Sequence, residues 1–264
     1  MASSFVKTQL FFKRLLLERV SNPDIYKDFN INLNYDLTDG DLDYLLQIII
    51  HNEYLYNINI RLSDTLKDSH ILNKLLSKIN TKKQFTYLNF YIKYLNDNLF
   101  FEFTNFILNI NSSVTSFKLQ MKYKNKDTEE KYTKIILKNL IKNENLNIYN
   151  LYFVDCSFSS YENMTLLNEL LIKNKNKIKN IYLYNSIIYN NNFIADVSSL
   201  KTFEISYFNL SQIKFFPKEK LNLSNNNISL DGIQIISEYI KNQNCTLQKL
   251  NLNNNYIGDE GCTF

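Results

Sequence analysis

The chain has 264 residues, of which 45% are hydrophobic, so it can form one large domain or two small ones. Its 30 basic and 26 acidic residues give a formal net charge of +4, which is too mild to indicate nucleic-acid binding. No stretch of about eighteen uncharged apolar residues predicts a membrane span, and Lys7, Lys13 and Arg14 would interrupt the apolar part of a secretion signal.

Residues 1–30 do not follow the pattern of the rest of the chain. A helix could begin at Ser3 or Ser4 and end before Pro23. Its apolar face would carry Phe5, Phe12, Leu16 and Val20. Because a stack of repeated units needs a cover for its first unit, we predict an N-terminal helical cap over residues 1–30. A short partner-binding helix is the alternative.

From residue 31 onward a strand motif recurs, most clearly near the end of the chain. LxLxxN at Leu221 returns at Leu250, 29 residues later. Its two leucines point to the same face of a short strand, and its Asn can bond the backbone where the strand turns. After the turn, Ile233, Ile236 and Ile240 lie on one face of a helix. Such units must stack, with strands in a parallel concave sheet and helices on the convex side.

The same template, placed along the whole chain, predicts nine strand starts: Ile31, Ile58, Leu88, Phe117, Leu151, Ile181, Phe203, Leu221 and Leu250. Periodic apolar residues predict convex helices over residues 41–50, 65–79, 97–108, 127–141 and 161–173. The segments after Ile181 and Phe203 are too short and broken for more than one helical turn. We therefore expect the superhelix to flatten between about Ile181 and Leu221.

The turn residue, five positions after each start, varies along the chain. Cys156 and Ser186 are familiar replacements for the Asn of the motif. Lys93, Lys122 and Phe208 cannot reproduce the hydrogen bonds of an amide. The register is therefore least certain in these units, in particular those starting at Phe117 and Phe203.

The last part of the chain resembles the ribonuclease-inhibitor-like subfamily of leucine-rich repeats, shared by NOD-like receptors and the Ran GTPase-activating protein. The resemblance rests on LNLSNNNISLDG from Leu221, on NCTLQKLNL and on the closing NNYIGDEG. It implies an α/β leucine-rich-repeat solenoid, or horseshoe, with a parallel concave sheet, convex helices and partly irregular repeats. In this subfamily the concave strands and adjoining loops bind another macromolecule, and the resemblance implies no enzymatic activity.

We expect the leucine-rich repeat domain to span residues 31–264, with its last repeat truncated. The repeat would continue into a convex helix after Gly261, but the sequence ends at Phe264. The apolar edge at Leu250 and Leu252 would then stay open. This predicts a fragment of a longer array or a fraying end, with high amide exchange beyond Leu250.

Residues for catalysis or cofactor binding are scarce. Four glycines without a GK[ST] motif cannot build a phosphate loop, and two histidines without CxxC or HExxH do not form a closed metal site. We therefore expect no enzyme, no cofactor and no metal. Three distant cysteines, Cys156, Cys245 and Cys262, favour a reducing compartment and a cytoplasmic location.

Arg61 is the one residue that suggests a regulatory activity. The Ran GTPase-activating protein, which the resemblance includes, uses an arginine on the repeat rim, and Arg61 is the only arginine beyond the N-terminal segment. The residues that flank Arg61 do not reproduce that arginine loop, so no catalytic role is transferred.

The concave face offers a more general binding hypothesis. Positions one, three and four after each start are expected to point outward, and in the middle of the sheet they are aromatic or apolar. Tyr and Arg dominate interface hot spots. The alternative is that Tyr, with 19 copies, is simply common here and favoured in strands. The candidate partner-binding residues are Arg61, Leu62, Tyr91, Ile92, Met121, Tyr152, Tyr182, Tyr184 and Tyr207.

The sequence thus predicts a non-enzymatic protein-interaction module or scaffold that binds a protein of unknown identity, with no role in nucleic-acid or membrane binding. Two alternatives stay open: a regulator of a small GTPase, and the inert truncated fragment of a longer repeat array.

Overall fold

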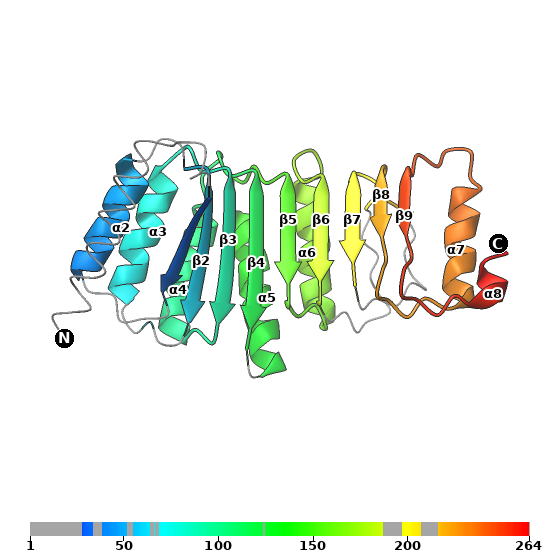
Figure 1. The fold of residues 1–264 in the computed structure, drawn as a ribbon, viewed down its shortest axis with the longest axis horizontal. Coiled ribbons are helices and arrows are strands. Elements are labelled where there is room, and N and C mark those ends of the chain that lie inside the picture. The colour runs from blue at the N-terminus through cyan, green and yellow to red at the C-terminus, as the bar shows by residue number, and fades with distance from the viewer. Residues whose placement is uncertain are drawn as a thin grey trace.

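The computed structural model describes residues 28–33, 39–51, 55–63, 66, 69–123, 125–186, 197–206 and 216–263. Nine strands in this part of the chain form one parallel sheet whose spatial order follows the sequence (Figure 1). They are β1 (Asp28–Leu33), β2 (Asn57–Ser63), β3 (Tyr87–Lys93), β4 (Ser116–Lys122), β5 (Asn150–Val154), β6 (Asn180–Tyr184), β7 (Thr202–Ile205), β8 (Lys220–Asn222) and β9 (Lys249–Asn251). The predicted cap over residues 1–30 lies outside the described residues up to residue 27, and residues 28–30 belong to β1.

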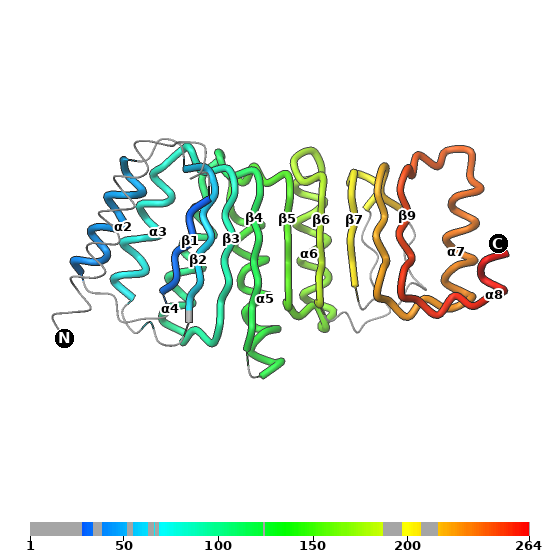
Figure 2. Tube along the Cα trace, in the orientation of Figure 1, coloured from blue at the N-terminus to red at the C-terminus, as the bar shows by residue number. Residues whose placement is uncertain are grey.

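Helices alternate with these strands and cover one face of the sheet (Figures 1 and 2). They are α2 (Asp39–His51), α3 (Ser69–Thr81), α4 (Asp97–Leu108), α5 (Lys126–Lys142), α6 (Tyr161–Lys173), α7 (Leu230–Ile240) and α8 (Gly258–Gly261). The predicted helices agree with α2 to α6 within a few residues. The residues described between β6 and β8 contain no helix, while residues 187–196 and 207–215, on which the expected flattening depends, lie outside the described residues. The predicted α/β solenoid is confirmed.

Backbone pairing confirms eight of the nine predicted strand starts. One line of Cα partners joins Ile58, Leu88, Phe117, Leu151, Ile181, Phe203, Leu221 and Leu250. The first start is wrong, because Phe29 and not Ile31 pairs with Ile58. A shift of two residues keeps the same side chains inward. Both Phe29 and Ile31 are buried, so the apolar pattern alone could not distinguish them.

The outward placement of Leu62, Ile92 and Met121 is also wrong. Their strands, β2 to β4, have seven residues each, so the alternation of inward and outward side chains continues through the fourth position after the start. All three side chains are 0% exposed. From β5 onward the strands end earlier, and the same position takes a positive φ at the turn in Asp155, Asn185, Asn225 and Asn254.

The turn side chains bond backbone carbonyl groups of their own and the preceding unit. The side-chain amide of Asn226 donates to the carbonyls of Leu223 at 2.7 Å and Ile205 at 2.9 Å. Asn255 donates to the carbonyls of Leu252 and Leu223, each at 2.8 Å. Ser186 donates to the carbonyl of Tyr184 at 3.1 Å, which supports its predicted role as a replacement. Asn226 and Asn255 therefore join neighbouring units, and the two bonds of Asn226 are buried, where water could not replace them.

The apolar core runs between the sheet and the helices for the length of the described solenoid. Phe90 contacts Phe103 and Phe106 of α4 edge-on, at centroid distances of 5.0 and 5.3 Å. At the other end, Leu250 and Leu252 are only partly buried. They line an apolar groove of about 270 Å³ with Ile233, Ile236, Ser237, Ile240, Lys241 and Gly261.

Candidate partner-binding face

The face of the sheet that the helices leave uncovered is here called the open face. It is built from the side chains that alternate with the buried ones in each strand. Five of the predicted site residues lie on it: Arg61, Tyr91, Tyr152, Tyr182 and Tyr184. Tyr207 lies outside the described residues, and the three buried side chains corrected above lie beneath the face.

Three tyrosines form a continuous aromatic surface over β5 and β6, here called the tyrosine platform. Tyr152 and Tyr182 are paired in register, and their rings stack at a centroid distance of 4.2 Å and an interplanar angle of 6°. The ring of Tyr184 lies 6.0 Å from that of Tyr182. Partial burial is the main cause that raises the pKa of the Tyr182 hydroxyl, so that hydroxyl is neutral around physiological pH. The platform is thus an uncharged, preordered contact surface.

Glu204, a residue that the sequence did not single out, supports the edge of the platform from β7. The residue is only 4% exposed. Its carboxylate accepts hydrogen bonds from the Tyr184 hydroxyl at 2.6 Å, the Lys220 ammonium at 2.5 Å and the Asn222 amide at 3.2 Å. Burial alone would raise the pKa of this carboxyl, but the three donors outweigh it and the net pKa is lowered. Glu204 is therefore ionised and fixes the position of Tyr184.

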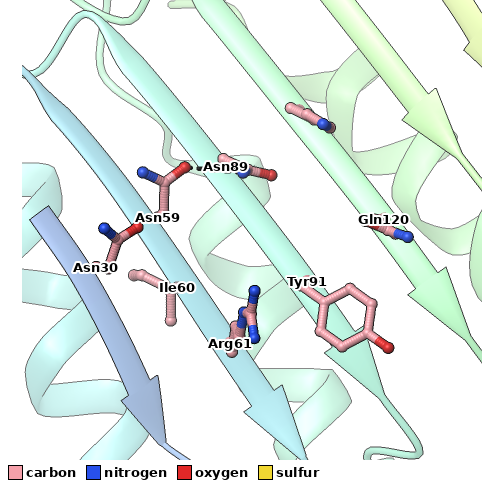
Figure 3. Close-up of a pocket in the computed structure, with 8 residues that line it drawn as sticks. Asn30, Asn59, Ile60, Arg61, Asn89, Tyr91 and Gln120 are labelled. Carbon is pink, nitrogen blue, oxygen red and sulfur yellow. Dashed lines mark hydrogen bonds between the residues drawn. The ribbon is translucent and has the colours of Figure 1, made fainter. Parts of the chain in front are cut away.

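A hollow of about 550 Å³ opens on the same face over β1 to β4 (Figure 3). Arg61 lies beside Tyr91 in this view, with the guanidinium carbon 5.9 Å from the ring centroid. The side-chain amide of Asn89 donates to the Asn59 carbonyl oxygen at 2.8 Å. The other lining residues are Asn30, Ile60, Lys118 and Gln120. The lining is polar and cationic, with no carboxylate among its residues.

A third row of outward side chains, one residue before each start, was missing from the sequence prediction. It includes Tyr87, Asn150 and Asn180. The amide of Asn180 donates to Asn150 at 2.6 Å, and that of Asn150 donates to the Ser116 hydroxyl at 2.8 Å. The signal was available, because the residue before each apolar start is polar or Tyr in all of these strands. This row widens the open face by one residue per strand.

Other kinds of site find no support in the described part of the chain. No group of three or more His, Cys, Asp and Glu side chains gathers there in a way that could hold a metal ion. Among the described helices, none combines the length and the hydropathy needed to cross a membrane.

The C-terminal part of the sequence matches a known protein family. The family model described as Leucine Rich repeat matches residues 219–237 and 243–264, the region of β8 to α8. No curated protein sequence matches the chain significantly. The matched repeats continue, in the same register, the strand line that runs back to Phe29. The match shows leucine-rich repeats in residues 219–264, and the repeated units in a single parallel sheet give the described chain the fold of an α/β leucine-rich-repeat solenoid.

Proposed function

We propose that this protein is a non-enzymatic interaction module or scaffold, and that its protein partner binds the open face at the tyrosine platform. Leucine-rich repeats generally serve as protein-interaction modules. The observation that carries the proposal is the stack of Tyr152 on Tyr182, continued by Tyr184, which is 36% exposed. On the helix-covered side most apolar side chains pack into the core, although Tyr161 and Ile172 of α6 are 64% and 68% exposed.

The tyrosine platform suits a binding site because its side chains lose little conformational entropy when a partner contacts them. Tyr offers a large contact area with few rotatable bonds, and binding loses less entropy when the rings are already held in place. Stacking holds Tyr152 and Tyr182, and Glu204 holds Tyr184 through its hydroxyl. A partner can therefore bury the platform without ordering these side chains first.

The subfamily of the repeats and the location of the protein are further parts of this proposal. We infer the ribonuclease-inhibitor-like subfamily from the repeats at Leu221 and Leu250, and a cytoplasmic location from the three cysteines, which are free. No observation favours activation of a small GTPase. That hypothesis relied on an arginine on the rim, whereas Arg61 lies within β2 on the open face.

Affinity recovery of bound proteins from native lysate tests the proposal with Tyr182→Ala. Removing one ring of a central hot spot is expected to weaken partner binding by about 2 kcal/mol or more, roughly thirtyfold. Tyr161→Ala is the matched control, because Tyr161 is 64% exposed at the start of α6, among the helices that cover the other face. Equal recovery by both variants, with unchanged circular dichroism, would refute a binding site on the open face.

A further inference from the structure

We propose that the hollow over β1 to β4 binds an acidic segment of the partner, with Arg61 and Lys118 pairing its carboxylates. This inference rests on the proposed function and gives the partner a chemical class. It predicts a protein segment with at least two Asp or Glu residues next to apolar or aromatic ones.

The two cations of the hollow, Arg61 and Lys118, are not paired with carboxylates of the described residues. Across the described residues, Arg61 contacts the face of Tyr91, and neither Arg61 nor Lys118 has a carboxylate within ion-pair distance. Elsewhere, Lys220 of β8 pairs with Glu204 of β7 at 2.5 Å, and Lys201 pairs with Glu219 at 3.0 Å just before these two strands. The hollow therefore carries two positive charges that no carboxylate among the described residues neutralises.

The lining of the hollow is rich in side-chain amides. Asn30, Asn59, Asn89 and Gln120 surround the two cations with side-chain amides. Asn59 accepts the hydrogen bond from Asn89 through its side-chain oxygen. This bond does not use the two N–H donors of Asn59. A carboxylate is an acceptor only and suits a site of ammonium, guanidinium and amide donors. The lining thus favours carboxylates over neutral side chains.

The spacing of Arg61 and Lys118 suits two carboxylates of one extended segment. Arg61 of β2 pairs with Tyr91 of β3, and Tyr91 pairs with Gln120 of β4. Gln120 is two residues after Lys118 in the same strand. Two strand spacings and two residues along a strand separate the Cα atoms of Arg61 and Lys118 by about 12 Å. Acidic residues two to four positions apart in an extended chain, about 7 to 13 Å, can meet both cations.

Carboxylates next to the hollow favour a short acidic segment over a long polyanion. Lys118 is the register partner of Tyr152, so the hollow borders the tyrosine platform directly. At the edge of the hollow Asp155 accepts from the lining residue Gln120 at 2.8 Å, and beyond the platform the face carries the ionised Glu204. A nucleic-acid strand or other polyanion that crosses the sheet would meet these carboxylates. An acidic segment that ends at Lys118 and continues with apolar residues would not.

The test uses the full chain and two fluorescein-labelled peptides of about eight residues, long enough to cross from β2 to β6. One carries two Glu residues three positions apart in its first half and Tyr and Leu in its second half, and the other carries Gln in place of each Glu. Binding is measured by fluorescence anisotropy at low and at moderate salt. Arg61→Gln and Lys118→Gln remove the charges of the hollow. Lys249→Gln is the matched control, because Lys249 is an exposed lysine on the same face of the sheet, in β9, at the opposite end from the hollow.

We expect the Glu peptide to bind at least about tenfold more tightly than the Gln peptide, with weaker binding at higher salt. Arg61→Gln and Lys118→Gln should each weaken binding of the Glu peptide about tenfold, whereas Lys249→Gln should leave it unchanged. Equal affinities for the two peptides would overturn the inference, and so would an equal loss in the Lys249 control. If the peptides bind equally while partner recovery still depends on Tyr182, the acidic segment is wrong and the proposed function stands.

Discussion

Replacing Glu204 with Gln tests how the carboxylate holds the platform. The side chain of Glu204 is 6% exposed, and its two oxygens accept from Tyr184, Lys220 and Asn222. Gln keeps the size of the side chain but turns one oxygen into an amide group with two N–H donors. One of the donors that now faces an oxygen will then face another donor. The substitution also removes the charge that pairs with Lys220.

The expected loss follows from these contacts. A hydrogen bond to a charged group contributes about 1.5 to 3 kcal/mol, and the lower end applies because the Lys220 side chain is 42% exposed. One weakened neutral bond adds about 0.5 to 1 kcal/mol. We therefore expect Glu204→Gln to lower the free energy of unfolding by about 2 kcal/mol at neutral pH.

The pH dependence has a defined sign. The pKa of Glu204 is lowered in the folded protein, so the carboxylate contributes stability that is fully present above the ordinary Glu pKa of about 4.3. That contribution is lost as the pH falls through the lower pKa of the folded state. The difference between wild type and Glu204→Gln should therefore shrink on acidification, since the other carboxylates act alike in both proteins.

Urea unfolding of both proteins, followed by circular dichroism at neutral and at acidic pH, measures this difference. Unchanged stability at neutral pH would show that the bonds to Glu204 contribute nothing. A difference that stays constant or grows on acidification would refute the ionised state of the carboxylate. A Lys220→Met variant that is as stable as wild type would refute the ion pair.

Three further predictions concern other parts of the chain. Asn226→Ala leaves the carbonyls of Ile205 and Leu223 without their side-chain donor, so urea unfolding should show a free energy of unfolding lower by about 2 to 3 kcal/mol. A decrease below about 0.5 kcal/mol would contradict a stabilising role for these hydrogen bonds. Met121→Ala should cost about 2 to 5 kcal/mol in the same assay because the side chain is 0% exposed, and a neutral result would instead place it on the surface. Burial raises the pKa of the Cys156 thiol, whereas Cys262 is exposed. A maleimide should therefore label Cys262 in the native protein and Cys156 only after denaturation, as measured by mass spectrometry of the digested protein. Labelling of Cys156 in the native protein would contradict its burial.

The repeat and its helices could be predicted because they depend on periodicity. Leucine or another apolar residue at alternate positions defines a strand whose face is fixed by packing, and this gave the register from Ile58 to Leu250. The first start failed for the same reason, since alternation continues through both Phe29 and Ile31 and does not mark where a unit begins. Periodicity determines the buried face but leaves shifts of two residues undefined.

The composition of the site was harder to predict. Leu62, Ile92 and Met121 were assigned outward because one short strand length was applied to every unit, although β2 to β4 are longer than the strands that follow. The longer strands could have been recognised in the sequence, because β2 to β4 carry a third apolar residue, two positions after the second one. Glu204 was missed for another reason, because a single Glu in a strand gives no signal until its donors from β6 and β8 are placed around it.

Site-specific crosslinking tests the central claim most directly. The photoreactive amino acid benzoylphenylalanine, placed at Tyr182 on the open face or at Ile172 on α6, is irradiated in native lysate and the adducts are analysed by mass spectrometry. Ile172 is 68% exposed and serves as the reference for a helix surface. The account predicts one reproducible protein adduct from position 182 and none of that protein from position 172. The same adduct from position 172 alone would contradict a partner-binding site on the open face.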